Sequence, residues 1–439
     1  MKRIILLCFS IVMLFSNCAT ITEKRYISER EEVVKKITLT NGLTIIAREI
    51  PNNIVSIQIW FKVGSRNESD KNNGISHFIE HLVFKGTKKR GVNQLSKEIE
   101  SVGGKINGAT SKDYTFYYAT VAKDFIDIAI DGLIDSVLNP VFNNEEIERE
   151  RKVVIEEILR QDDNPYSCLF NLLNDISYVN HPYKMPVIGK KEIIESLTRE
   201  DIVSYYNKFY VPENMIIVIV GDFNTEEIVK KIKKYFSTKS SKSHLLNINM
   251  KAEFNSCKIE KETSFKKCYL AVSWLAPTVD NEDTYAMDVI TTVLGQGRSS
   301  RLYRELKEKQ QLCYSIESSY GTMKDEGLFK IFAILDEKNN ILLQEKIMEE
   351  INKMKEGITL NELNKVKTMI ENSYIFDHET NESIASSLGY YEAISSYKLE
   401  LSYLDNIKKI TLDDVKRVAN KYLSSKPSIV VFKPKKESF

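Results

Sequence analysis

Residues 197–220 read LTREDIVSYYNKFYVPENMIIVIV, and residues 410–433 read ITLDDVKRVANKYLSSKPSIVVFK. The two stretches align at a constant offset of 213 residues (410 minus 197). The identical pairs are Thr198/Thr411, Asp201/Asp414, Asn207/Asn420, Lys208/Lys421, Ile216/Ile429 and Val218/Val431. Each stretch has at its second position a Thr suited to capping a helix and contains, near its end, an apolar run typical of a buried strand. The recurrence predicts two domains of similar fold.

The chain before the first copy alternates between strand and helix patterns. Strand patterns occupy residues 37–39, 43–49 and 54–64, and helical patterns occupy residues 74–84, 94–102, 122–138 and 144–161. Trp60 and Trp274 stand in an early strand of each half, at nearly the offset of the repeat. The expected fold class is therefore α+β, with two homologous domains that each pack helices on a mainly antiparallel sheet.

The charge balance limits the classes of partner. The 439 residues include 62 basic and 61 acidic side chains. Such a balance offers no extended positive field for a nucleic acid or for electrostatic docking on a membrane. Nucleic acid is therefore not an expected partner.

The N-terminus has the pattern of an export signal. Lys2 and Arg3 precede an apolar run over residues 4–15, which is too short to span a bilayer. Cys18 follows in LFSN-C and resembles the lipid-modified cysteine of bacterial lipoproteins. We expect an exported bacterial protein at the periplasmic face or cell envelope, anchored to a membrane by a lipid on Cys18. Ordinary signal cleavage nearby and a retained anchor stay open as alternatives.

The remaining cysteines do not suggest a metal site. They are Cys168, Cys257, Cys268 and Cys313, and none is in a C-x-x-C spacing. Two interpretations stay open for Cys257 and Cys268, namely a disulfide across a hairpin or two separate buried thiols.

A candidate metal-binding motif lies in GISHFIEHLVFKG, at residues 74–86. Helical residues four apart share a face, so His77 and His81 can reach one ion while Glu80 lies beside them. Zinc suits imidazole nitrogen, and a neighbouring carboxylate can take the proton of an attacking water. The spacing is H-x-x-E-H, the reverse of H-E-x-x-H.

Short patterns of this kind also occur by chance on exposed helices. Here the flanking residues are apolar on nearly every side: Phe78, Ile79, Leu82, Val83 and Phe84. The helix is therefore expected to be buried, and buried polar side chains without partners are costly. A bound metal would satisfy them.

A third ligand must come from elsewhere, and IERERKVVIEEILRQ at residues 147–161 offers several glutamates. Glu150 and Glu157 are seven apart, so they lie on one face and flank the apolar stripe of this helix. Glu156 points to roughly the opposite side. The pattern leaves Glu157 or its neighbour Glu150 as the ligand and excludes Glu156.

Together, HFIEHLVFKGT, ERERKVVIEE, DDNPY and HPYKMPVIGK resemble the pitrilysin/insulinase family, which includes mitochondrial processing peptidase. The resemblance covers nearly all of the chain after residue 36 and implies a half clamshell. It implies that His77, His81 and Glu157 bind one Zn²⁺ per chain. It also implies that Glu80 is the catalytic base and that Glu150 orients the site.

The resemblance extends to substrate contacts. It implies that the strand containing Asn107, Gly108 and Ala109 holds an extended peptide by strand addition. In the second domain it implies that Tyr314 and Lys307 reach the substrate, although Lys307 stands where the family has an arginine and lacks its bidentate fork. Because the chain encodes only one half of a clamshell, a homodimer or a homologous partner chain is implied.

These patterns predict five segments: a signal peptide at 1–18, a tether at 19–36, a zinc-binding catalytic domain at 37–236, a linker at 237–253 and a metal-free second domain at 254–439. The expected function is a zinc-dependent endopeptidase that hydrolyses short or unfolded polypeptides. The alternatives are a non-catalytic structural subunit of a processing-peptidase-like complex and a lipoprotein that only binds peptides.

Overall fold

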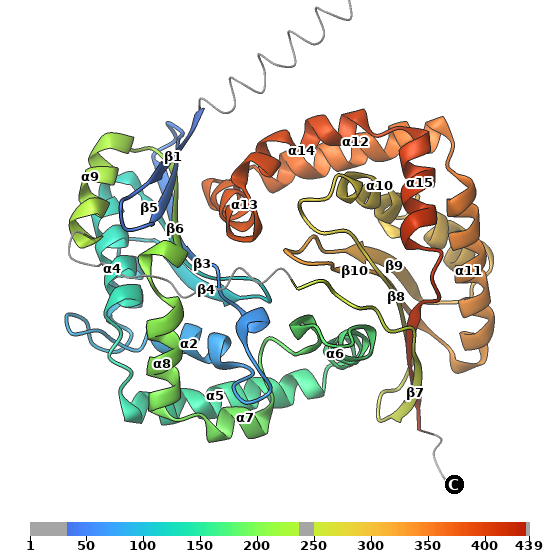
Figure 1. Cartoon of the computed structure of the whole chain (residues 1–439), viewed down its shortest axis with the longest axis horizontal. Coiled ribbons are helices and arrows are strands. Elements are labelled where there is room, and N and C mark those ends of the chain that lie inside the picture. The colour runs from blue at the N-terminus through green and yellow to red at the C-terminus, as the bar shows by residue number, and fades with distance from the viewer. Residues whose placement is uncertain (1–32, 237–249, 436–439) are drawn as a thin grey trace, which may run out of the picture.

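The computed structural model describes residues 33–236 and 250–435, which form two halves that each contain one sheet and its helices (Figure 1). The predicted signal peptide with Cys18, most of the predicted tether and most of the predicted linker lie outside the described residues. The expected fold class of two homologous α+β halves is confirmed.

The first sheet has six strands in the order β1-β2-β6-β3-β5-β4. Their bounds are β1 Val34–Thr38, β2 Thr44–Glu49, β3 Ile54–Phe61, β4 Lys105–Thr110, β5 Thr115–Ala122 and β6 Met215–Gly221. Only the β2–β6 pair is parallel. β1 begins at Val34, within the stretch that the sequence pattern assigned to the tether. β4 forms one edge of the sheet, which leaves its outer side free for another strand.

Within the described residues, the second sheet repeats this arrangement without a counterpart of β1. Its order is β7-β11-β8-β10-β9, and only the β7–β11 pair is parallel. The bounds are β7 Lys258–Thr263, β8 Cys268–Leu275, β9 Ser315–Tyr320, β10 Leu328–Leu335 and β11 Ser428–Pro434. β9 therefore stands at the sheet edge that β4 occupies in the first half.

The two copies of the sequence repeat adopt the same local structure. They form α8 (Arg199–Phe209) followed by β6, and α15 (Leu412–Tyr422) followed by β11. Thr198 and Asp201 make a capping box at α8, and Thr411 and Asp414 make the same box at α15. The identical residues of the repeat thus fix the same helix start in both halves.

Helices cover the sheets. In the first half these are α2 Ile75–Val83, α3 Gln94–Ser101, α4 Ile126–Leu138, α5 Asn144–Asp162, α6 Pro165–Ser177, α7 Lys191–Ser196, α8 and α9 Thr225–Phe236. In the second half they are α10 Asp283–Gly295, α11 Asn340–Glu356, α12 Leu360–Asp377, α13 Asn381–Ile394, α14 Tyr397–Lys409 and α15. The helical pattern over residues 122–138 begins too early, because β5 continues to Ala122 and α4 starts only at Ile126.

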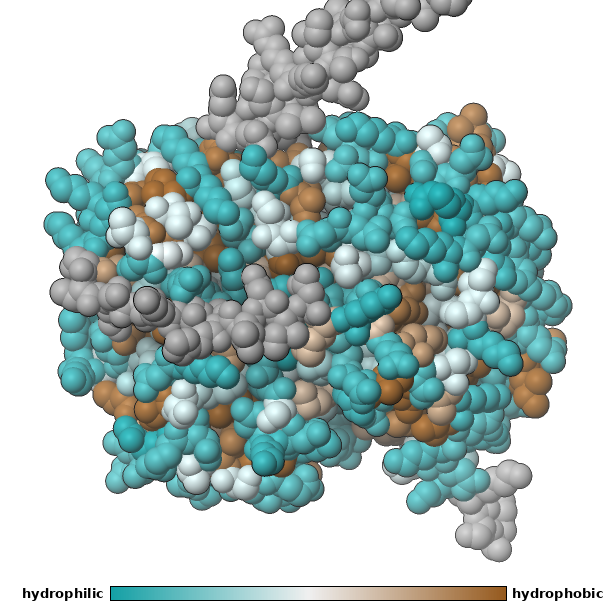
Figure 2. All heavy atoms as spheres, in the orientation of Figure 1, coloured by the Kyte–Doolittle hydropathy of each residue, from teal (hydrophilic) through white to brown (hydrophobic). Residues whose placement is uncertain are grey.

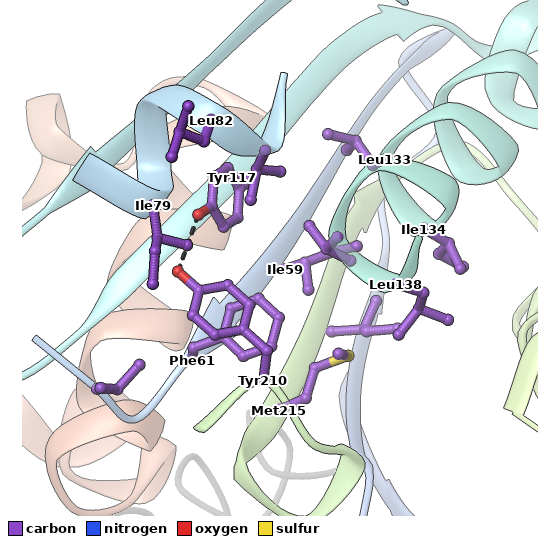
Figure 3. Packing of buried hydrophobic residues seen from close by; sticks show 14 of the residues in the cluster. Ile59, Phe61, Ile79, Leu82, Tyr117, Leu133, Ile134, Leu138, Tyr210 and Met215 are labelled. Carbon is purple, nitrogen blue, oxygen red and sulfur yellow. Dashed lines mark hydrogen bonds between the residues drawn. The ribbon is translucent and has the colours of Figure 1, made fainter. Parts of the chain in front are cut away.

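The first core lies between these helices and the sheet. Figure 3 shows Ile79 and Leu82 of α2 beside Tyr117 of β5, with Leu133 of α4 across from them. The hydroxyls of Tyr117 and Tyr210 lie 2.9 Å apart, so these buried phenols satisfy each other. Because side chains of α2 form part of this core, packing fixes the helix against the sheet.

Each half also lends one helix to the sheet of the other half. α6 packs on β8 and β11, in a cluster containing Leu169, Leu173, Ala271, Phe332 and Val430. In return α13 packs on β3 and β6, in a cluster containing Trp60, Val218, Val220, Ile384, Ala385 and Leu388. Figure 1 shows α13 beside the first sheet and α6 beside the second. Each fully buried aliphatic side chain contributes about 1.5–3 kcal/mol, so this exchange joins the two halves firmly.

A buried polar network joins the halves as well. Arg66 donates to Asp325 at 2.6 Å, and His181 Nε2 lies 3.0 Å from the same carboxylate. Tyr183 donates to Asp113 at 2.6 Å and accepts from the backbone amide of Asp325 at 3.1 Å. His181 and Tyr183 of the HPYKMPVIGK motif therefore serve the junction between the halves.

The four cysteines beyond the N-terminal segment, Cys168, Cys257, Cys268 and Cys313, are free thiols. Hydrophilic residues cover most of the face shown in Figure 2, with apolar residues in scattered patches. Within residues 33–236 and 250–435, no helix has the length and apolar character needed to cross a bilayer.

Gly389 of α13 tests the contact between the exchanged helix and the first sheet. A Cβ atom at this position would lie 2.3 Å from Cε2 and Nε1 of the fully buried Trp60. We expect Gly389→Ala to destabilise the fold by about 1–3 kcal/mol through overpacking, measured as a lower midpoint of thermal unfolding. Gly321→Ala is the control, because a Cβ there has no neighbour within 4 Å. Equal midpoints for the two variants would contradict this packing.

Candidate metal centre

The start of α2 is set by a buried carboxylate. Glu68 accepts hydrogen bonds from the backbone amides of Gly74 at 2.7 Å and Ser76 at 2.9 Å, and from the Asn73 side chain at 2.9 Å. Gly74 has a φ of +95°, and a Cβ there would lie 2.7 Å from the Cα of Gly189. The first turn of α2 is therefore held by a carboxylate at its positive end and by close backbone packing.

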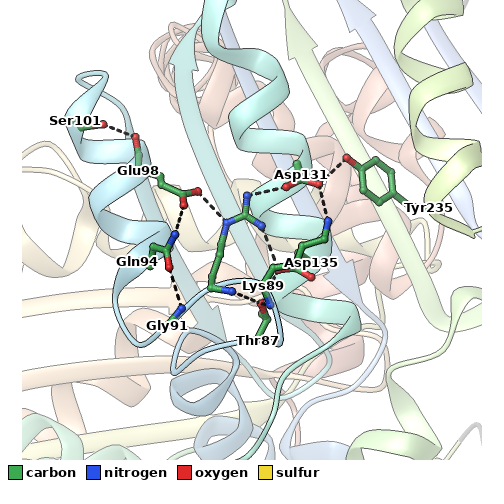
Figure 4. A network of polar contacts seen from close by, with 10 residues as sticks. Thr87, Lys89, Gly91, Gln94, Glu98, Ser101, Asp131, Asp135 and Tyr235 are labelled. Carbon is green, nitrogen blue, oxygen red and sulfur yellow. Dashed lines mark hydrogen bonds and ion pairs between the residues drawn. The ribbon is translucent and has the colours of Figure 1, made fainter.

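The opposite end of α2 is held through Arg90, whose partners Glu98, Asp131 and Asp135 are labelled in Figure 4. Its guanidinium donates to Glu98 of α3 at 2.8 Å and to Asp131 and Asp135 of α4 at 2.6 and 3.1 Å. Thr87 donates to Asp135 at 2.6 Å. Because Arg90 and Thr87 lie in the loop after α2, this network ties the exit of the helix to α3 and α4.

The faces of α2 divide as the apolar pattern predicts. The polar residues His77, Glu80 and His81 are only half-buried. The apolar residues of the helix are buried, namely Ile75, Phe78, Ile79, Leu82 and Val83. The rings of His77 and His81 have centroids 4.8 Å apart. The three polar side chains therefore point into a common pocket.

Helix α5 brings a carboxylate to the two imidazoles. Glu157 Oε2 lies 3.8 Å from His77 Nε2 and 3.6 Å from His81 Nε2. Ligand atoms of His77, His81 and Glu157 all lie within 4.8 Å of one another, and this is the only such group found in the described ranges of the chain. Glu156 is exposed on another face of α5.

Glu150 is placed behind the ligand group. Its Oε2 lies 3.2 Å from His81 Nδ1, and its Oε1 accepts from Lys85 Nζ at 2.8 Å. This contact directs the other nitrogen of the His81 ring toward Glu157. A carboxylate that binds the second ring nitrogen is the usual way to fix the tautomer of a metal-binding histidine.

The electrostatics of the pocket suit a divalent cation. Burial, together with the neighbouring His81, lowers the pKa of His77 to about 3, so this imidazole is neutral and free to coordinate. Burial opposes the charged form of His81, but Glu150, Glu80 and Glu157 outweigh it and raise the pKa of His81. Nδ1 of His77 is buried without a hydrogen-bond partner. Two imidazoles and one carboxylate form a zinc donor set with a position left for water.

The base candidate, Glu80, lies in the same pocket. Burial raises the pKa of Glu80; His81 and a hydrogen bond from Thr110 oppose this shift, and the charge of Glu157 adds to it. Thr110 Oγ1 donates to Glu80 Oε2 at 2.9 Å. Thr110 was missed by the sequence interpretation, although it stands two residues after Gly108 and therefore on the same face of the strand.

The pocket has a volume of about 580 Å³ and lies between α2, α5 and the edge strand β4. One wall of the pocket is formed by β4, through Asn107, Gly108, Ala109 and Thr110. A Cβ at Gly108 would lie 3.2 Å from Glu80 Cγ, so the missing side chain lets the strand approach the base closely. The side chain of Asn107 accepts from the backbone amide of Gly108 at 2.9 Å.

The two second-domain candidates lie apart from this pocket. Tyr314 donates to Asp336 at 2.8 Å and accepts from Lys267 at 2.8 Å, on the surface of the second domain. Lys307 lies over the ring of Tyr303 at 4.6 Å. Neither residue lines the metal pocket of the same chain.

Family models place this geometry in a known context. Residues 43–191 match the model described as Insulinase (Peptidase family M16), and residues 196–370 match the Peptidase M16 inactive domain. A protein of Rickettsia felis named as an uncharacterized zinc protease is 30% identical over 404 residues, which cover 90% of this chain and 96% of that protein. The chain belongs to the M16 peptidase family.

Other relatives and solved structures agree with this assignment. The uncharacterized zinc protease YmxG of Bacillus subtilis is 28% identical over 405 residues, covering 92% of this chain and 98% of that protein. The crystal structure of a protease from Helicobacter pylori superimposes with a TM-score of 0.86 at 27% identity, covering 91% of this chain and 99% of that chain. A putative M16-like peptidase from Alicyclobacillus acidocaldarius has a TM-score of 0.81 at 19% identity, covering 92% of this chain and 98% of that one, and supports the fold alone.

The two neighbouring glutamates of α5 allow a matched test of the ligand set. We expect Glu157→Gln to weaken zinc binding by more than about 100-fold, since even groups behind the ligands contribute about 10–100-fold. Glu156→Gln should bind zinc as the unmodified protein does, because Glu156 is exposed and outside the pocket. Competition with a chromophoric chelator measures both affinities. Equal losses in the two variants would mean that another side chain is the third ligand.

Proposed function

We propose that this M16 protein is a zinc-dependent endopeptidase that hydrolyses short or unfolded polypeptides. The observation that carries the proposal is one pocket containing three side chains suited to bind zinc, a half-buried carboxylate and a sheet edge. His77, His81 and Glu157 supply the ligands, and Glu80 supplies the carboxylate. A zinc ion held there would polarise the substrate carbonyl and make a nearby water more acidic.

Glu80 is suited to move the proton in this reaction. It is a carboxylate in the same pocket as the ligands, and Thr110 fixes one of its oxygens. A raised pKa makes a carboxylate a better acceptor for the proton of the attacking water. The same group can then return the proton to the leaving amine. Glu150 acts through His81 and is a positioning residue.

The edge strand β4 supports a peptide substrate. Its outer side carries backbone groups without a neighbouring strand in the sheet, so an extended peptide can add there by main-chain hydrogen bonds. Asn107, Gly108 and Ala109 bring this edge into the pocket wall. Only chains that can become extended fit such an edge, which favours short or unfolded polypeptides.

We further propose that a second copy of the chain, or a homologous partner, completes the site. The pocket is open to water in one chain, and water weakens the electrostatic contribution of Glu80. Tyr314 is about half exposed (49%) and lies outside the pocket of its own chain. A two-fold dimer would let Tyr314 and Lys307 of one chain reach the pocket of the other.

The alternative of a non-catalytic subunit would require the loss of ligands or base. The model described as inactive matches residues 196–370, which contain none of the ligand residues. His77, Glu80, His81 and Glu157 lie in the part that matches the insulinase model. All four residues thus lie outside the part that matches the inactive-domain model, which favours a catalytic protein over a non-catalytic subunit.

The role of Glu80 is tested by Glu80→Gln. The amide cannot accept a proton, so we expect cleavage of an unstructured fluorogenic peptide to fall by at least about 100-fold. Zinc content by metal analysis should stay at one per chain, because Glu80 is outside the ligand group. Glu156→Gln is the matched control and should keep its activity. Normal turnover by a zinc-loaded Glu80→Gln protein would remove Glu80 as the base.

Shared sites are tested by mixing Glu80→Gln with Tyr314→Phe protein. If each site takes residues from two chains, the mixed dimer contains one site with all its groups intact. We expect the mixture to exceed the activity of either parent, measured after subunit exchange has been verified by native mass spectrometry. A mixture that stays at the mean of its parents despite exchange would place every catalytic group in one chain.

A further inference from the structure

The second half contains a cavity in the position that the metal pocket occupies in the first half. It has a volume of about 530 Å³ and lies between α10, α12, α13, α14 and the edge strand β9. We call it the counterpart cavity, because β9 occupies the place of β4 in its sheet and α10 packs on β9 as α2 packs on β4. α12 and α5 are both long helices that precede an exchanged helix, and each lines its own cavity.

The lining residues on the two helices have the same spacing. His77, Glu80 and His81 line the metal pocket at positions i, i+3 and i+4 of α2. On α10 the residues that line the counterpart cavity are Asp288, Thr291 and Thr292, with the same spacing. The second half thus also presents polar side chains of one α10 face to a cavity, with a different donor set.

The new donor set leaves one carboxyl group without a cation. Asp288 Oδ2 accepts from the Tyr403 hydroxyl at 2.9 Å, and burial raises the pKa of Asp288 to about 7. A second carboxylate that lines the cavity, Glu400, already has partners, since it lies 2.7 Å from His378 Nε2 and accepts from Tyr374 at 2.6 Å. Asp377 stands at the exposed rim.

The rest of the lining favours an organic cation over an anion or a metal ion. No Lys or Arg is among the described residues that line the cavity. Among the described residues, no three ligand atoms of His, Cys, Asp or Glu converge there to hold a metal ion. Hydroxyls of Thr, Ser and Tyr surround the space and can accept from N–H donors, and the rings of Tyr374, Tyr391 and Tyr403 can contact a positive group. A volume near 530 Å³ suits a small organic molecule.

We propose that the counterpart cavity is a binding site for an organic cation, whose ammonium or guanidinium group pairs with Asp288. The cation is either a free small amine or the basic side chain of a peptide. Binding supplies the positive charge that Asp288 lacks and leaves the His378–Glu400 pair unchanged. This site is separate from the metal pocket and does not depend on the peptidase activity proposed above.

Binding there would stabilise the junction between the halves. Ser383, Ser387 and Tyr391 of α13 line the cavity. Ile384 and Leu388 on the other side of the same helix pack on the first sheet. A ligand therefore contacts the helix that joins the halves, and thermal unfolding of the full chain should report it.

Calorimetric titration and thermal unfolding of the full chain test the proposal with three probes. These are 1,5-diaminopentane, N-acetyl-lysine methylamide and its uncharged norleucine analogue. We expect at least one of the two cations to bind and raise the unfolding midpoint, and the norleucine analogue to do neither. Binding of the diamine alone identifies a small amine, and binding of the lysine derivative identifies a peptide side chain. Absence of binding by both cations, or equal binding of the norleucine analogue, would overturn the proposal.

Variants locate the binding. We expect Asp288→Asn to weaken cation binding at least tenfold, while Asp175→Asn, an exposed carboxylate of α6, leaves it unchanged. Ser373→Arg places a guanidinium at the exposed rim without altering the buried residues and should also abolish binding. Ser373→Gln is its uncharged control. If Asp288→Asn does not fold, the comparison of Ser373→Arg with Ser373→Gln locates the binding site. Unchanged cation binding in Ser373→Arg would refute the assignment of the site to this cavity.

Discussion

Glu68 accepts hydrogen bonds from the first backbone amides of α2, and the position of every group in the metal pocket depends on where that helix begins. A shift of one residue would rotate His77, Glu80 and His81 by about 100° and turn them into the core. Gly74 and Gly189 have no side chains, so the first turn of α2 and the backbone at Gly189 can pack in direct contact. Arg90 then fixes the exit of the helix. The chemistry thus rests on a helix fixed at both ends.

Much of this site follows from spacing alone. Helical periodicity places His77, Glu80 and His81 on one side of α2 and separates Glu157 from Glu156 on α5, because each argument concerns one helix. The role of Thr110 could not be predicted from the sequence, since its contact with Glu80 depends on how β4 packs on α2. The lining of the counterpart cavity was hidden for the same reason, because Asp288 meets Tyr403 only through the packing of α10 on α14.

The fold shows a similar division. The repeat around Thr198 and Thr411 predicts two similar halves, because a capping box is local and readable. The exchange of α6 and α13 could not be predicted from the sequence. An amphipathic pattern indicates that a helix buries one face, but it does not indicate which sheet that face packs on. The two polar pockets have different linings within one architecture. An imidazole kept neutral by burial, that of His77, suits a metal, whereas a carboxyl without a counter-ion suits a positive ligand.

The exchanged helices also constrain the order in which the chain can fold. The first sheet receives its second covering layer from residues 381–401, near the end of the chain. Until these residues are available, Trp60, Val218 and Val220 would face solvent on an otherwise complete sheet. The contacts that close this core span more than three hundred residues of sequence, and such contacts form slowly. A half-synthesised chain therefore exposes an apolar sheet face. Nascent chains must be kept from associating through this face until α13 has been made.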